Sequence, residues 1–153
     1  MMVLLKRLGL VLVLALSPAL TAHADASDTR AVMVPESGTY SRTVSTQSPE
    51  AQKFFDQGLR LAWGFYFPES IASYQQASLF DPEHPMPYWG IAHAAGPNPN
   101  SRYAQMPDDP QGAGLAAIQS ALARIDRATP MEAELIWALH IFYDADRIPD
   151  PKA

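Results

Sequence analysis

The stretch that decides the fold is residues 48–82, SPEAQKFFDQGLRLAWGFYFPESIASYQQASLFDP. Its start, Ser48-Pro49-Glu50, favours a helix, because serine can cap the first turn, proline suits the first helical position and an acid suits the positive helix end. Apolar residues then recur at helical spacing at Ala51, Phe55, Leu59 and Ala62. Pro68-Glu69 starts a second helix and Asp81-Pro82 ends it. This stretch therefore predicts two helices joined by a short turn.

Helix signals continue on the C-terminal side of this stretch. We expect a third helix from Met86 to about Ala95 and a fourth that starts at Asp109-Pro110. The apolar stripe of the fourth helix is expected at Leu115, Ile118, Leu122 and Ile125.

A fifth helix opens at Thr129-Pro130-Met131-Glu132, a capping box in which the threonine and the glutamate satisfy each other's backbone N–H groups. We expect it to run to about Asp146. Apart from one short extended piece near Ala31–Val34, no segment reads as a strand. The sequence therefore predicts an all-α fold of about five helices.

Residues 1–24 have the three parts of a secretory signal peptide. Lys6 and Arg7 supply the positive start, residues 8–16 (LGLVLVLAL) are apolar and uncharged, and Ala22-His23-Ala24 places small residues where a signal peptidase reads. The apolar run is much shorter than the ~20 residues of a membrane-spanning helix, so we expect no stable membrane anchor. We expect cleavage near Ala24, with Ala26 as the alternative site, and a periplasmic or secreted protein. An uncleaved tether is the competing interpretation.

Composition excludes several functional classes. The chain has 153 residues, of which 48% are hydrophobic and 18% charged, as in a globular domain. A net charge of −5 argues against nucleic acid as a partner. The absence of cysteine excludes a disulfide scaffold, a thiolate zinc site and a thiol nucleophile. Residues 25–47 contain Ser, Thr, Gly and Pro and have no helical period, so we expect a flexible linker there, followed by a helical domain over 48–148.

A repeat of 34 residues is visible between Phe54 and Tyr88, each an aromatic residue early in a first helix. The intervening spacing resembles the tetratricopeptide repeat, W-x2-L-G-x2-Y, then A-x3-F, then A and P. Gly58, Ala77 and Pro82 match that pattern. The aromatic and alanine positions of the pattern hold Phe54, Leu61, Ser70 and Tyr74.

The second unit begins at Pro85 but is interrupted after Ala95, and the third unit has a first helix only. Together with Tyr88-Trp89-Gly90-Ile91-Ala92, the stretch is similar to a group of bacterial tetratricopeptide-repeat proteins of undefined biochemical role. The resemblance implies an α-solenoid of helix-turn-helix units. Because Gly58 and Ala77 are the small residues of the unit, they are expected at the contact between its two helices.

The resemblance also implies where a partner would bind. Tetratricopeptide arrays commonly line a concave surface with the first helix of each pair. Carried over by position, this predicted groove comprises Gln52, Phe55, Leu59, Trp63, Met86, Trp89 and His93. Such an apolar and aromatic groove suits an apolar peptide segment. The alternative is that these residues belong to the core.

A second candidate contact is the loop Gly96-Pro97-Asn98-Pro99-Asn100, whose prolines and glycine exclude a helix. Its candidate residues are Gly96, Pro97, Asn98 and Asn100, because the amides of Asn98 and Asn100 could bond a ligand. The alternative is an ordered turn whose asparagines hold the local backbone.

Residues for catalysis are few. None of the motifs of zinc proteases, serine hydrolases, phosphate-binding loops or dinucleotide-binding folds occurs in the globular part. His140 and Asp144 share a helix face and could form half of a metal site, but no second pair of ligands is evident. We therefore predict no catalytic residues, no metal site and no cofactor.

The end of the chain leaves alternatives open. The fifth helix is apolar on nearly every side, and it is followed by a proline-rich tail at 149–153. This pattern indicates truncation of a longer protein, or a helix that is covered by self-association or by a partner. The leading hypothesis is a non-catalytic module that binds protein or peptide in the periplasm. The alternatives are the N-terminal domain of a longer exported enzyme or metal-linked protein, and a structural assembly subunit.

Overall fold

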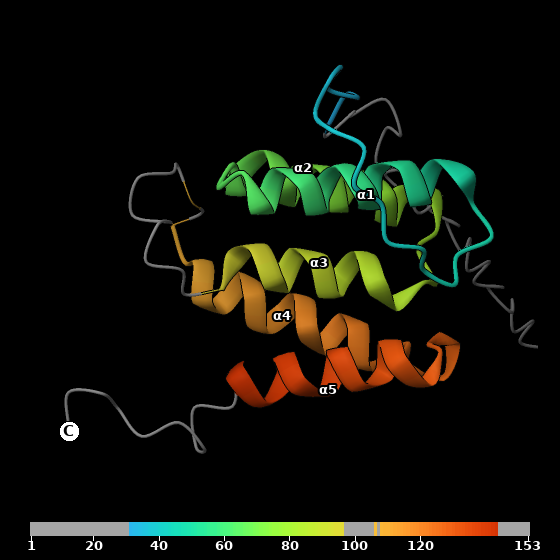
Figure 1. Ribbon diagram of the computed structural model, residues 1–153. Coiled ribbons are helices and arrows are strands. Elements are labelled where there is room, and N and C mark those ends of the chain that lie inside the picture. The colour runs from blue at the N-terminus through green and yellow to red at the C-terminus, as the bar shows by residue number, and fades with distance from the viewer. Residues whose placement is uncertain (1–30, 97–105, 107, 144–153) are drawn as a thin grey trace, which may run out of the picture.

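The computed structural model describes residues 31–96, 106 and 108–143, and these form an all-α fold without any strand (Figure 1). Its helices, each antiparallel to the one before, are α1 (Pro49–Trp63), α2 (Phe67–Phe80), α3 (Pro85–Ala95), α4 (Pro110–Leu122) and α5 (Pro130–Tyr143). The prediction of five helices in an all-α fold is thus confirmed. The extended piece expected near Ala31–Val34 is not a strand.

Local chemistry explains where the helices begin, because each has proline at its first or second position. The Ser48 hydroxyl accepts a hydrogen bond from the Ala51 N–H at 3.2 Å, and the Asp109 carboxylate accepts one from the Gly112 N–H at 2.9 Å. The expected capping box is present. Glu132 accepts from the Thr129 N–H at 2.7 Å, and the Thr129 hydroxyl accepts from the Glu132 N–H at 3.3 Å.

The fourth helix is shorter than its apolar pattern predicts. α4 ends at Leu122, and Ile125 lies in a separate 3₁₀ turn, η2 (Ile125–Arg127). The backbone tightens there: the Arg124 N–H bonds the Ala121 carbonyl and the Ala128 N–H bonds the Ile125 carbonyl, both at 3.0 Å. A 3₁₀ helix rises further per residue than an α-helix does. Here a single 3₁₀ turn forms the corner between α4 and α5.

One core runs through all five helices. Each helix contributes a side chain that is fully buried: Phe55, Tyr74, Met86, Ile118 and Ile136. In addition to sequential neighbours, α1 packs on α3 and α3 packs on α5. The helices therefore pack on their neighbours along the chain, and α3 also packs on α1 and α5.

Small residues bring the first three helices close together. A Cβ atom on Gly58 of α1 would lie 2.7 Å from the ring of Tyr74 in α2, and one on Gly90 of α3 would lie closer still to the same ring. Ala77 is fully buried. The expected position of Gly58 at the contact with α2 is therefore confirmed, and Ala77 is a core residue. None of the helices in the described ranges combines the length and the apolarity needed to cross a membrane.

Candidate binding site

Four of the seven residues of the predicted groove are core residues. Phe55 and Met86 are fully buried, while Leu59 and Trp89 are 5% and 9% exposed. The indole N–H of Trp89 donates to the Leu135 carbonyl at 3.1 Å, so this side chain joins α3 to α5. The expectation of an open groove lined by these four residues is therefore wrong, because they are buried in the core where α1 packs on α2 and α3, and α3 packs on α5.

The other three predicted groove residues lie apart. Trp63, at the end of α1, is 70% exposed. His93 is exposed and stacks on Trp89, with 5.1 Å between the ring centroids. Gln52 is half-buried and contacts the segment that precedes α1, as set out below. Of the predicted loop, Gly96 is a buried cap of α3, whereas Pro97, Asn98 and Asn100 lie outside the described residues.

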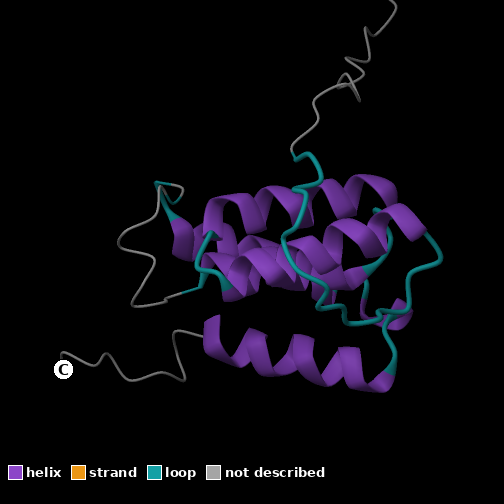
Figure 2. Ribbon diagram, turned by 45° about the horizontal axis from the view of Figure 1, so that its top comes forward, coloured by secondary structure: helices purple, strands orange, loops and turns teal. Residues whose placement is uncertain are grey.

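The segment before α1 is not a free linker. Residues 31–47, called the strap here, run along α1 and across the helices to the start of α5 (Figure 2). The strap has no regular secondary structure, yet side chains of α1 and α5 hold its backbone. Residues 31–47 thus differ from the linker expected over 25–47 in that they are hydrogen-bonded to the helices, and residues 25–30 lie outside the described residues.

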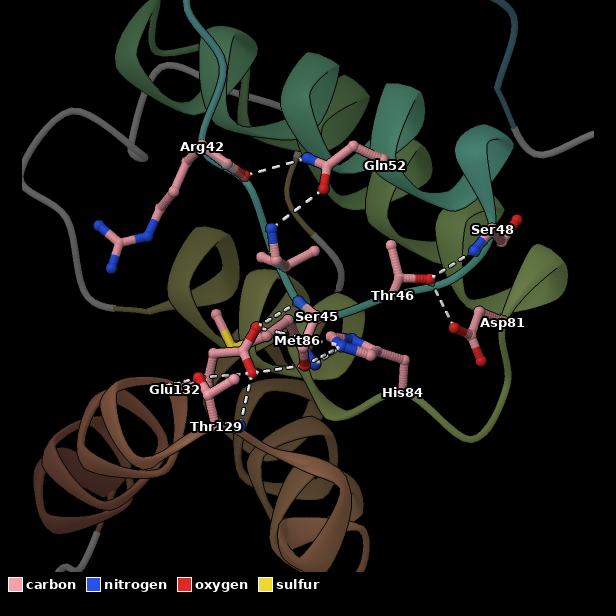
Figure 3. Close-up of polar contacts among 11 residues, drawn as sticks. Arg42, Ser45, Thr46, Ser48, Gln52, Asp81, His84, Met86, Thr129 and Glu132 are labelled. Carbon is pink, nitrogen blue, oxygen red and sulfur yellow. Dashed lines mark hydrogen bonds and ion pairs between the residues drawn. The ribbon is translucent and has the colours of Figure 1, made fainter.

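Two glutamines of α1 hold the strap in the same way. The Gln52 carboxamide donates to the Arg42 carbonyl and accepts from the Val44 N–H, both at 3.0 Å (Figure 3). The Gln57 carboxamide donates to the Val32 carbonyl at 2.9 Å and accepts from the Val34 N–H at 2.7 Å. In each case the amide bonds a carbonyl and the N–H two residues later, as a neighbouring strand does in a parallel ladder. We call each pairing an amide bracket.

A buried acid strengthens the Gln52 bracket. Asp56, 8% exposed, accepts from the Arg42 N–H at 3.0 Å and from the Ser41 hydroxyl at 2.7 Å. Its carboxylate also accepts from the Gln52 amide at 3.0 Å, which fixes the orientation of that amide. Among the described residues Asp56 forms no ion pair, so these hydrogen bonds compensate its burial.

The far end of the strap is held where α3 and α5 begin. The Ser45 N–H and hydroxyl donate to the two oxygens of Glu132, at 2.8 and 2.7 Å. The Ser45 oxygen lies 2.9 Å from His84 Nε2, and His84 Nδ1 accepts from the Met86 N–H at 3.3 Å. This network assigns the imidazole proton to Nε2, which donates to Ser45.

Burial and hydrogen bonding set the charges of this cluster. Burial lowers the pKa of His84, and the carboxylates of Glu132 and Asp81 only partly oppose that effect. Burial by itself raises the pKa of Glu132, but hydrogen bonds from Thr129 and Ser45 outweigh it and hold that pKa below its ordinary value. At neutral pH the cluster therefore contains a neutral imidazole and a carboxylate.

Although Ser45, His84 and Glu132 are the residue types of a catalytic triad, their hydrogen bonds run the wrong way. In a triad the serine donates to the histidine, and the other ring nitrogen donates to the acid. Here Ser45 donates to Glu132, and Nδ1 of His84 is engaged by a backbone N–H. The cluster therefore positions the strap and does not activate the hydroxyl. Within the described ranges, no three acidic or histidine side chains gather as a metal site would require.

A separate apolar surface covers the outer side of α5. Its large side chains are Met131, 65% exposed, Trp137, 51%, Ile141, 47%, and Phe142, 38%. The only charged residue among the exposed positions of this helix is Glu134. We call this surface the α5 outer face. It agrees with the expectation that apolar residues fall on more than one side of this helix.

No family model, curated protein or solved structure matches this chain. The sequence placed Gln52 in a partner groove, whereas in the structure it bonds the strap, and the roles of Asp56, Gln57 and the strap were not predicted. A signal was present, because Gln52 and Asp56 are polar residues four apart beside an apolar helical stripe.

Proposed function

We propose that this chain is a non-catalytic helical-repeat module, of the tetratricopeptide type, that binds another protein in the periplasm. The observation that carries the proposal is the α5 outer face. Its four large side chains expose on the order of 400 Å² of surface, the size of the largest apolar patch on an ordinary monomer. Such patches on soluble proteins are often binding sites.

The position of this face within the fold supports the proposal. α3 packs against α1, α2, α4 and α5, whereas in the described residues α5 packs mainly on α4 and more weakly on α3. Each helix of a solenoid is covered by its neighbours. The α5 outer face is thus an uncovered solenoid surface, and the chemistry that fits it is an apolar helix face.

Aromatic anchors give the surface a centre for binding. Trp137 and Ile141 lie four residues apart, which places them on adjacent turns of one side of α5. Tryptophan is enriched among the few residues that carry most of an interface's binding energy. We therefore expect Trp137 and Ile141 to dominate the affinity and Glu134 to contribute little.

A photo-crosslinking residue at position 141 tests this function in cells. We expect adducts to a distinct protein, and we expect them to disappear when Trp137→Lys is added. A crosslinker at Leu79, an exposed residue of α2, is the matched control and should give none. Adducts only to a second copy of this chain would establish self-association instead. If position 141 gives no adduct at all, the binding function is wrong.

A further inference from the structure

The strap is held more as a bound peptide is held than as part of the core. Val44 is its only buried residue, at 5% exposed. Val32, Met33, Val34 and Tyr40 are apolar or aromatic, yet each is more than 40% exposed. The strap therefore inserts one apolar anchor, and its other attachments are hydrogen bonds, largely to its backbone.

The seam between strap and helices is also loosely packed. A cavity of about 450 Å³ lies between strap residues 37–40 and the end of α1 at Arg60 and Trp63. Two more, of about 210 and 230 Å³, lie where the strap meets the start of α5 and where it meets Gln57 and α2. All three are open to solvent, so the strap covers the underlying helices only in part.

We infer that the surface beneath residues 41–45 is a binding site for an extended peptide, which the chain's own strap occupies in this structure. This inference goes beyond the proposed function, because the site consists of α1 together with His84 and Glu132 and does not use the exposed side chains of the α5 outer face. The occupant is an extended peptide with a small hydroxyl residue at its first and fifth positions and a β-branched apolar residue at its fourth.

Each requirement follows from one contact of the strap. The hydroxyl at the first position matches Ser41, which donates to Asp56. The β-branched residue at the fourth position matches Val44 in its buried site. The hydroxyl at the fifth position matches Ser45, which bonds Glu132 and His84.

The second position of the peptide accepts any residue other than proline, and the third position accepts any residue. The Gln52 bracket reads only backbone atoms, at Arg42 and Val44, and Asp56 also bonds the Arg42 N–H. Thr43 is exposed. The site thus reads the backbone through two side chains of α1 and reads sequence at three positions.

Competition with the tethered strap provides the test. A fluorescent peptide of residues 39–47, TYSRTVSTQ, is titrated against the full chain and followed by anisotropy. In the variant Val44→Asp the tethered strap loses its anchor while the peptide keeps its own. We expect this variant to bind the peptide at least tenfold more tightly than the wild-type chain does.

Two variants control the measurement. Thr43→Asp adds the same charge at an exposed strap position and should bind as weakly as the wild type. Adding Gln52→Ala to Val44→Asp removes the bracket and should abolish the gain. If Val44→Asp is folded by circular dichroism and still binds no more tightly than the wild type, the inference is refuted.

Hydrogen exchange of the wild-type chain keeps the inference testable if Val44→Asp does not fold. The amide protons of Arg42, Val44 and Ser45 should exchange through an opening at least tenfold more frequent than the opening that exposes the central amides of α1. Equal rates for the strap and α1 would show that the strap opens only when the whole domain unfolds, and would overturn the inference.

Discussion

Replacing Gly90 with alanine should destabilise the protein, although alanine is the better helix former. A Cβ atom at this position would collide with the ring of Tyr74, which is fully buried. The ring is also in close contact with Gly58, because a Cβ atom on that residue would lie 2.7 Å from it. The added methyl group must therefore separate α3 from α2 or force Tyr74 out of its rotamer.

The expected size follows from two opposing effects. Overpacking a core costs about 1–3 kcal/mol, and the close contact of Tyr74 with both Gly58 and Gly90 favours the upper end. Alanine recovers about 1 kcal/mol of helix propensity. The free energy of unfolding should thus fall by about 2 kcal/mol, which lowers the melting temperature by roughly 8–16 °C for a domain of about 100 residues.

Thermal and urea unfolding followed by circular dichroism measure this change. Gly64→Ala is the matched control, because Gly64 is exposed and the nearest atom to its added Cβ, at 3.1 Å, belongs to the exposed ring of Tyr66. That variant should stay within about 0.5 kcal/mol of the wild type. In a Tyr74→Leu background, Gly90→Ala should cost less than in the wild type. A melting temperature for Gly90→Ala equal to or above that of the wild type would refute the packing argument.

Three further predictions concern single groups. The Tyr74 hydroxyl has no hydrogen-bond partner in the described part of the chain, because the neighbouring Ser70 hydroxyl donates to the Gly58 carbonyl at 2.7 Å. In urea unfolding, Tyr74→Phe should therefore leave the free energy of unfolding unchanged or raise it by about 1 kcal/mol. A loss above that size would reveal a missed hydrogen bond. His84 has a lowered folded-state pKa, so the unfolded chain takes up a proton first as the pH falls below about 6.5, and stability declines there. The variant His84→Asn, which can still cap Met86, should lose less stability than the wild type between pH 7 and 5.5. An equal loss would assign the pH dependence to other groups. Glu132 has a depressed folded-state pKa, so its contribution to the free energy of unfolding is complete above pH 4.5 and is lost as the pH falls further. The variant Glu132→Gln should therefore flatten the dependence of stability on pH in that acidic range. An unchanged dependence would contradict the role of its hydrogen bonds. N-terminal sequencing of the exported protein should begin near Asp25, and retention of Met1 on a cytoplasmic protein would end the proposal of export.

The helix boundaries could be predicted because their causes are local. Ser48, Asp109 and Thr129 cap helices through atoms within three residues, so the signal is contained in the sequence. The contact of Gly58 with the second helix could also be predicted, since the repeat pattern places a small residue there. The end of α4 could not be predicted, because apolar residues keep helical spacing as far as Ile125, which lies in the 3₁₀ turn.

The placement of the strap could not be predicted for a different physical reason. Its main attachments are backbone atoms, and every residue except proline supplies the same N–H and carbonyl. Val44 is the one strap residue that is buried, but Val32, Met33, Val34 and Tyr40 are also apolar or aromatic and are exposed, so residue type alone does not identify the anchor. Likewise, the repeat register gives the helix face on which Phe55 and Trp89 lie, but not whether neighbouring helices close over that face.

The amide brackets change which substitutions the strap tolerates. A segment recognised through its backbone can vary its exposed side chains, so Val32, Met33 and Thr43 are free to diverge. Proline is the exception at Val34, Arg42 and Val44, because it removes the N–H that Gln57, Asp56 or Gln52 accepts. A saturation library of the strap should therefore show broad tolerance at the three exposed positions and a strict exclusion of proline at the three bracketed ones.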